Sequence, residues 1–199
     1  MRRVALILLS ITMVFGVDKD KAKFTVGAAV SYTGYQTLDK ITIAAVPYLS
    51  DDQIKAAFGK AEPLRYGVLP VLVVMENGTG KALRLDLKAE FITADGRHVP
   101  ALPPDDVTHI GASSKAPRIG GSSPIPLPLP TRAKKGPLNT WEIEGRAFAP
   151  KLVPPDEAAS GFFYFYGDHM DGARLYLTGI KDAASGKDFF YFEVPVQKQ

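Results

Sequence analysis

Short hydrophobic runs separated by turn residues recur along most of the chain and predict β-strands. Residues 41–45 place apolar side chains at every second position, the period of two that turns one face of a strand inward. Residues 24–35 are rich in β-branched, aromatic and small side chains, which is compatible with an earlier strand. Val68–Met75 is nearly all apolar and so predicts a strand buried on both faces, with Pro70 near its start.

The segment after this apolar strand predicts an antiparallel meander over residues 68–100. Residues 76–80 have the composition of a turn, and residues 83–91 then alternate apolar and charged side chains. Asp95-Gly96 is a favoured hairpin turn between two strands. We therefore expect consecutive strands of this segment to pair with one another.

One clear helix is predicted over residues 50–58. Ser50 can cap the free amides of the first turn, and Gln53, three residues later, can return a hydrogen bond to Ser50. Asp51 and Asp52 suit the positive end of the helix dipole. Gly59 is a natural stop for the helix.

Strand patterns return in the last third of the chain, after a stretch of different composition. Gly, Ser and Pro dominate residues 111–139, which we interpret as a long loop within one domain. Four further strands are predicted, at residues 142–149, 161–166, 173–180 and 189–196. Eight or nine short strands and one short helix indicate a mostly β fold, an antiparallel β-sandwich.

The first 16 residues have the pattern of a cleavable signal peptide. Arg2 and Arg3 give a positive start, and an uncharged, largely apolar run follows from Val4 to Gly16. The run of 13 residues is shorter than the roughly 20 that span a bilayer. The competing interpretations are an uncleaved membrane anchor and a buried N-terminal segment. We expect cleavage after Gly16, a single domain over residues 17–199, and no stable transmembrane segment after cleavage.

Composition changes this picture in two respects. The chain has no Cys, so neither a disulfide framework nor a thiolate metal site is available to it. The full chain has 24 Lys and Arg against 21 Asp and Glu, but loss of Arg2 and Arg3 leaves 22 against 21. A mature chain this close to neutral lacks the basic footprint of a nucleic-acid-binding protein, and none is predicted.

Two stretches together resemble a known class of module. One stretch begins at residues 71–79, where an apolar strand ends in Asn77 and a small polar turn. It continues with the strand at 83–91 and with Asp95-Gly96. The other, at 154–165, is a Pro-rich acidic corner before a Gly and an aromatic strand. Over roughly residues 65–196 the chain resembles immunoglobulin-like modules of exported bacterial proteins, many of unknown function. The resemblance implies an immunoglobulin-like sandwich and an envelope or extracellular address, and it implies no catalytic residues.

The densest polar cluster is a weak candidate metal site. Asp168, His169 and Asp171 could together hold a divalent cation, since carboxylate oxygens and imidazole nitrogens suit such ions. However, an Asp-rich segment between glycines and between two strands is also a typical turn. Its spacing does not match the EF-hand loop, so we interpret the cluster first as a turn.

Other catalytic patterns are scarce. Asp105, Asp106 and His109 combine an acid pair with a His, but adjacent carboxylates in a Pro-rich loop are more often solvated. The sequence has no G-x-S-x-G elbow, no phosphate-binding loop and no dinucleotide fingerprint. No cofactor is predicted, and an enzyme is the less favoured interpretation.

Two further segments are candidate contact regions. Residues 107–141 contain five bases and no acid, so they could touch an anionic polymer, although a solvated loop is the simpler interpretation. Residues 124–130 alternate Pro with apolar residues and could dock in the groove of a partner or pack on their own domain. The aromatic runs at 162–166 and 189–192 could form an exposed contact row, but the core is their expected place.

The sequence thus favours an exported, periplasmic or extracellular, non-enzymatic binding or structural module of the cell envelope. Its expected partner is an envelope protein or an anionic envelope polymer. The first alternative is a small metal-dependent enzyme that uses Asp168, His169 and Asp171. The second is an accessory subunit that docks a partner through the Pro-rich loop.

Overall fold

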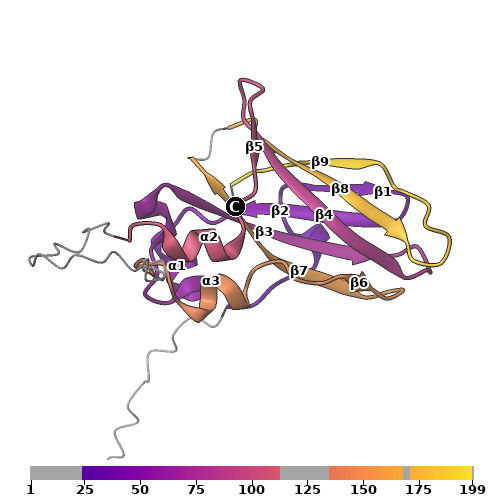
Figure 1. The fold of residues 1–199 in the computed structure, drawn as a ribbon. Coiled ribbons are helices and arrows are strands. Elements are labelled where there is room, and N and C mark those ends of the chain that lie inside the picture. The colour runs from indigo at the N-terminus through magenta and orange to yellow at the C-terminus, as the bar shows by residue number, and fades with distance from the viewer. Residues whose placement is uncertain (1–23, 113–134, 168–170, 199) are drawn as a thin grey trace, which may run out of the picture.

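Two antiparallel sheets form the centre of the molecule in the computed structural model, which describes residues 24–112, 135–167 and 171–198 (Figure 1). Sheet A has the strand order β1-β2-β3-β7, and sheet B has the order β5-β4-β8-β9, with β6 paired to β4. The strands are β1 (Tyr35–Leu38), β2 (Ile41–Pro47), β3 (Val68–Asn77), β4 (Leu83–Ile92), β5 (His98–Pro100), β6 (Leu152–Val153), β7 (Ala158–Tyr166), β8 (Arg174–Asp182) and β9 (Tyr191–Pro195).

Short helices gather on one side of the molecule (Figure 1). They are α1 (Asp51–Phe58), α2 (Pro104–His109) and α3 (Trp141–Gly145), together with the 3-10 turns η1 (Ala29–Ser31) and η2 (Pro63–Tyr66). None of the helices in the described ranges combines the length and the apolar character needed to cross a membrane. The prediction of a mostly β fold with antiparallel strands is confirmed, with more short helices in the described ranges than the single one expected.

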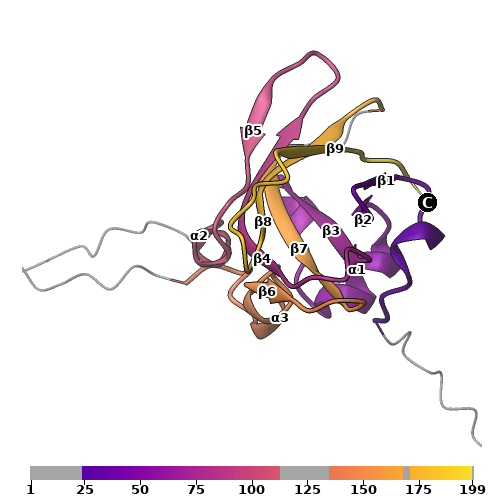
Figure 2. The ribbon, with the colours of Figure 1, turned by 90° about the vertical axis from the view of Figure 1, so that its right-hand side faces the viewer.

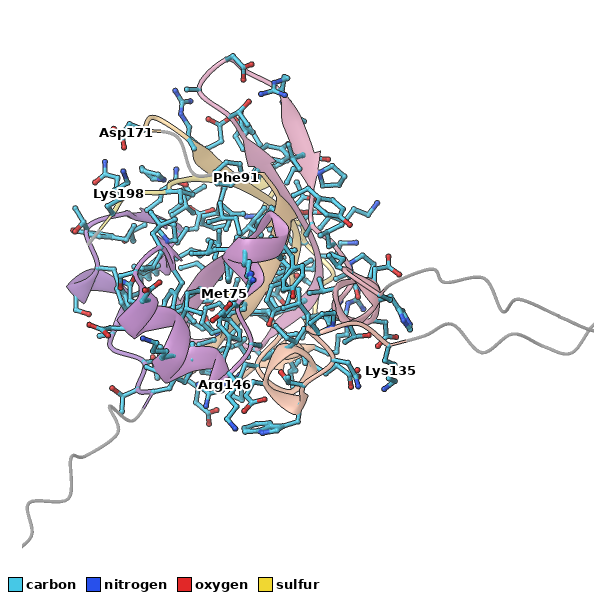
Figure 3. All side chains as sticks on the ribbon, turned by 90° about the vertical axis from the view of Figure 1, so that its left-hand side faces the viewer. Met75, Phe91, Lys135, Arg146, Asp171 and Lys198 are labelled. Atoms are coloured by element: carbon cyan, nitrogen blue, oxygen red, sulfur yellow. The ribbon has the colours of Figure 1, made fainter. Side chains whose placement is uncertain are left out.

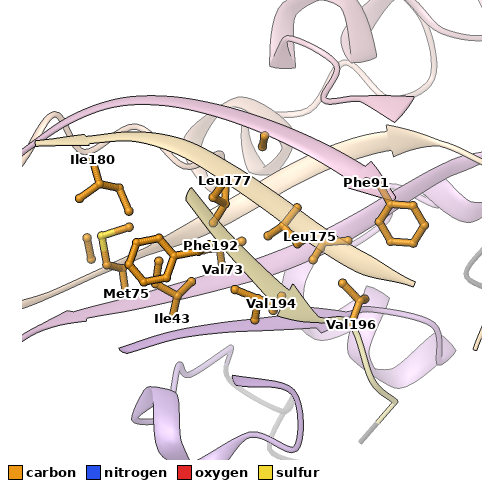
Figure 4. Packing of buried hydrophobic residues seen from close by; sticks show 14 of the residues in the cluster. Ile43, Val73, Met75, Phe91, Leu175, Leu177, Ile180, Phe192, Val194 and Val196 are labelled. Carbon is orange, nitrogen blue, oxygen red and sulfur yellow. The ribbon is translucent and has the colours of Figure 1, made fainter. Parts of the chain in front are cut away.

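Two separate hydrophobic clusters lie on the two faces of sheet A. The first fills the space between the sheets, where Val73 and Met75 of β3 lie among side chains of β8 and β9 (Figure 4). The second lies on the other face of sheet A, where Leu72 and Val74 pack with Phe58 of α1 and with residues of α2 and α3. Because β3 contributes alternate side chains to both clusters, its nearly continuous apolar sequence is confirmed as a strand buried on both faces.

The predicted meander over residues 68–100 is wrong in its first half. β3 pairs with β2 on one edge and with β7 on the other, so it has no edge left for β4. The chain instead crosses from sheet A to sheet B between Asn77 and Leu83. The second half is confirmed, because β4 and β5 pair as a hairpin around Asp95-Gly96.

The predicted helix at 50–58 is confirmed, including its cap. The Ser50 hydroxyl accepts a hydrogen bond from the Gln53 amide at 3.3 Å, and the Gln53 side chain accepts one from the Ser50 amide at 3.1 Å. Ile54, Ala57 and Phe58 are the buried face of α1. This face packs on sheet A as part of the second cluster.

The predicted strand at 142–149 is wrong, because Trp141–Gly145 forms α3. Ile143 is buried against the outer face of sheet A, and its carbonyl accepts a hydrogen bond from the Tyr164 hydroxyl at 2.8 Å. Burial raises the pKa of the Tyr164 phenol, so the hydroxyl keeps the proton that it donates. The strand expected within residues 24–35 is also wrong, since that segment holds η1, and β1 begins at Tyr35.

The strands predicted at 161–166, 173–180 and 189–196 are confirmed as β7, β8 and β9, with shifted ends. The long loop predicted at 111–139 lies largely outside the described residues. Its last part runs beside α2, where the Gly136 amide donates to the Thr108 carbonyl at 2.7 Å.

The crossing from sheet A to sheet B is held by the side chain of Asn77, which is 1% exposed. Its amide nitrogen donates to the carbonyls of Lys81, Val153 and Pro154 at 2.7, 3.0 and 2.8 Å. Its amide oxygen accepts from the backbone and the hydroxyl of Thr79 at 3.1 and 2.7 Å. One buried side chain therefore ties the crossing turn to the corner that precedes β7.

Asp182, at the end of β8, is a second buried polar group near the same crossing. Its carboxylate accepts from the amides of Ala184 and Ser185 at 2.9 Å and from the Lys81 ammonium at 3.0 Å. These donors, the Ser185 amide foremost and then Lys81, lower the pKa of Asp182 from 3.8 to about 2. The carboxylate therefore stabilises the turn after β8 and holds the Lys81 ammonium beside it.

Replacement of Asn77 by Ala is expected to lower the free energy of unfolding by about 3 kcal/mol, because buried carbonyls lose their donors. Denaturant unfolding followed by circular dichroism measures this loss. Asn139→Ala, at an exposed position, is the matched control and is expected to change stability by about 0.5 kcal/mol or less. Equal stability of the two variants would contradict the role given to Asn77.

Asp182 predicts a specific dependence of stability on pH. Because its pKa is lower in the fold than the ordinary 3.8, its charge stabilises the fold above pH 3.8, and this contribution is lost as pH falls toward about 2. Asp182→Asn should therefore be less stable than the wild type at neutral pH, and the difference should shrink over this acid range. Unfolding titrations at a series of pH values measure it, with the exposed Asp86→Asn as control. A difference that does not depend on pH would refute the assignment.

Candidate binding face

The predicted metal site is not assembled by the described residues. Asp168 and His169 lie outside the described residues. Asp171 has a side chain that is 90% exposed, with its carboxylate 3.8 Å from the Lys198 ammonium at the rim of the molecule (Figure 3). Within the described ranges, no group of three or more His, Asp and Glu side chains is placed to hold a metal ion.

The second acid cluster lies on α2. Asp105 and Asp106 are exposed in the first turn of this six-residue helix, and His109 is exposed in its last turn. Carboxylates at the start of a helix and an imidazole at its end complement the helix dipole. The arrangement matches helix electrostatics.

Most of the basic stretch and the whole Pro-rich segment at 124–130 lie outside the described residues. Of the five bases, Lys135 is described, and it is exposed. The aromatic side chains of β7 are largely core, as predicted: Phe162 and Tyr164 lie under the helices, and Phe165 faces sheet B. In the second aromatic run Phe192 is core, but Phe190 and Tyr191 are 77% and 51% exposed.

Sheet B has an outer face that no described element covers. Sheet A carries the helices on its outer side, whereas the clusters that contain residues of sheet B lie on its inner side only. We call the outward side chains of sheet B the open face. They come from four of the five strands of sheet B: Lys88 and Glu90 on β4, His98 on β5, Arg174 and Tyr176 on β8, and Tyr191 and Glu193 on β9.

Ring contacts and hydrogen bonds connect these side chains across the strands. The His98 imidazole lies 2.7 Å from the Glu90 carboxylate, and its ring meets the ring of Tyr176 edge to face at 6.4 Å. Tyr176 in turn stacks on Tyr191, with centroids 5.4 Å apart and an interplanar angle of 28°. A continuous row of aromatic groups therefore crosses sheet B from β5 to β9.

Charged groups flank this row. Arg174 donates to the Glu193 carboxylate at 3.0 Å. The Glu193 amide donates to the side-chain oxygen of Gln36 at 2.9 Å, which connects β9 to the edge strand β1 of sheet A. The face thus combines flat aromatic surface, hydrogen-bond donors and acceptors, and paired charges of both signs.

These groups are of the kind that recognition surfaces use. Tyr side chains bring a large apolar body and a polar tip, the combination that is enriched at protein interfaces. Sequence reasoning missed the face because its members come from two segments far apart in the chain, at 88–98 and 174–193. Alternation along β4 and β8 predicts that their polar residues point outward, but only the pairing of the strands brings them together.

Comparison of the chain with protein-family models, with curated proteins and with solved structures finds no match.

Proposed function

We propose that this chain is an exported, non-enzymatic binding module of the cell envelope, and that the open face of sheet B is its contact surface. The observation that carries the proposal is the uneven cover of the two sheets. Helices bury the outer face of sheet A, whereas the outer face of sheet B exposes a row of aromatic and charged side chains.

The order of the strands supports an immunoglobulin-like type of sandwich. The immunoglobulin fold places its first, second and fifth strands side by side in one sheet and the third, sixth and seventh in the other. Counted from β2, with β5 set aside as an extension of the second sheet beside β4, the strands β2-β3-β7 take the first, second and fifth places, and β4-β8-β9 take the third, sixth and seventh. The crossing at Asn77 corresponds to the step from the second strand to the third.

Export is proposed from the sequence of the first 16 residues, which have a positive start and an uncharged, largely apolar run. An exported domain without Cys must hold itself together by packing and hydrogen bonds alone. The two hydrophobic clusters and the Asn77 hydrogen bonds supply such support.

Of the two partner classes, the open face favours an envelope protein over an anionic polymer. The face carries charges of both signs: Arg174 is paired with Glu193, and Lys88 and Glu90 lie on β4. A polyanion is best bound by a surface of one sign, whereas paired charges around aromatic residues match a protein surface with its own mixed charges.

The test uses the full chain, expressed in the cells that encode it. We expect it to be exported with a mature mass that begins at Val17, and to stay with the envelope fraction on washing. Tyr176→Ser with Tyr191→Ser should weaken this retention by roughly tenfold or more, because buried aromatic residues carry much of the binding energy of interfaces. Fractionation followed by mass spectrometry measures both results.

The matched control is Tyr35→Ser with Tyr166→Ser, which changes two tyrosines that are 45% and 53% exposed on sheet A. This variant should be retained like the wild type. A cytosolic chain with Met1 intact would contradict the proposed address. Equal retention of the two double variants would contradict the proposed surface.

A further inference from the structure

A groove of about 390 Å³ opens on the side of the sandwich where β4 and β7 form the neighbouring edges of the two sheets. On this side β4 pairs with β6 through Leu83 and Arg84 and with β5 from Glu90 onward. The β4 residues between these two pairings have no partner strand on this side, although the other side of β4 pairs with β8. The segments that follow β5 and α3 border the gap, and Figure 2 shows α2 and α3 beside this edge.

Most of the side chains that line the groove are apolar. Phe148 and Phe163 stack inside it, with ring centroids 5.4 Å apart and an interplanar angle of 13°. Both are only partly buried and pack against the cluster between the sheets, so the groove leads to the core. Three prolines, at positions 100, 103 and 104, add wall surface that carries no backbone donor.

Close approach of two backbones holds this wall in place. The Phe148 amide donates to the Phe162 carbonyl at 3.0 Å, and Gly161 precedes this contact on β7. A Cβ at Gly161 would lie 2.5 Å from the Phe148 Cα, so a larger residue would push the Phe148 segment away from β7. The close backbone contact therefore fixes the position of the stacked rings at this edge.

The rim carries one cation that is available for a ligand. Lys88 is exposed and forms no ion pair with a described residue, whereas the other charged rim residue, Glu90, lies 2.7 Å from His98. All other side chains of the lining are apolar. The site therefore combines an apolar trough with a single positive group at its border.

We propose that this groove binds the hydrocarbon chain of a single-chain carboxylate amphiphile, with Lys88 at the carboxylate. A hydrocarbon has no polar group to satisfy, so the apolar side chains that line the groove suit it. The volume lies within the range of about 300–1,000 Å³ that is usual for small-molecule sites. This function goes beyond the proposed envelope contact: the groove borders the open face and shares Lys88 and Glu90 with it, whereas the Tyr176–Tyr191 stack lies outside the lining of the groove.

The probe is dodecanoate, titrated below its micellar concentration into the purified chain and followed by calorimetry. We expect saturable binding at one site and roughly tenfold weaker binding of decanoate, which buries two methylenes fewer. Lys88→Glu should weaken dodecanoate binding by about tenfold or more and leave dodecanol binding nearly unchanged. Ala101→Phe, which fills the groove from a partly exposed position, should abolish the binding of both probes.

Lys135→Glu is the matched charge control, and circular dichroism confirms that each variant is folded. Absence of saturable dodecanoate binding would overturn the proposal, as would binding that survives Ala101→Phe in a folded protein. Equal affinity for dodecanoate and dodecyltrimethylammonium would overturn the role of Lys88. Tighter binding of the peptide Pro-Ile-Pro-Leu-Pro-Leu-Pro than of dodecanoate would assign the groove to a protein segment instead. None of these outcomes depends on envelope retention, so the two proposals can fail separately.

Discussion

The buried amide of Asn77 stands where the chain leaves one sheet for the other, and much of the architecture depends on it. Both edges of β3 are taken, by β2 and β7, so the following strand must start a new sheet. A crossing of this kind exposes carbonyl groups near the core, which cost free energy unless donors reach them. The Asn77 side chain supplies donors to Lys81, Val153 and Pro154, so the turn into β4 and the corner before β7 are fixed together.

This arrangement makes the two sheets unequal. Sheet A, built around β3, is apolar on both faces and needs the helices as a second cover. Sheet B alternates apolar and polar side chains, so its outer face can stay in water. The same inequality leaves the edge between β4 and β7 partly open, because β5 and β6 cover only the two ends of β4.

Local patterns predicted local structure well and the assembly less well. Ser50 and Gln53 predicted α1 down to its cap, and the continuous apolar run of β3 predicted burial on both faces. The partner of β3 was predicted wrongly. The turn residues at 76–80 have the same composition whether the next strand pairs with β3 or crosses to another sheet, so they do not distinguish the two cases. In place of the strand predicted at 142–149, Trp141–Gly145 forms α3, whose Ile143 packs in one cluster with Tyr164, a contact that sequence spacing does not reveal. The open face escaped prediction for the same reason, as did the groove, whose rings Phe148 and Phe163 belong to segments that only the fold brings together.

The central claim is that the chain acts through the outer face of sheet B. Hydroxyl-radical footprinting of tyrosines tests it most directly, with the chain free in solution and then bound in its own envelope fraction. The account predicts that Tyr176 and Tyr191 lose reactivity on binding, whereas Tyr35 and Tyr166, exposed on sheet A, keep theirs. Protection of Tyr35 and Tyr166 with unchanged reactivity of Tyr176 and Tyr191 would contradict the account.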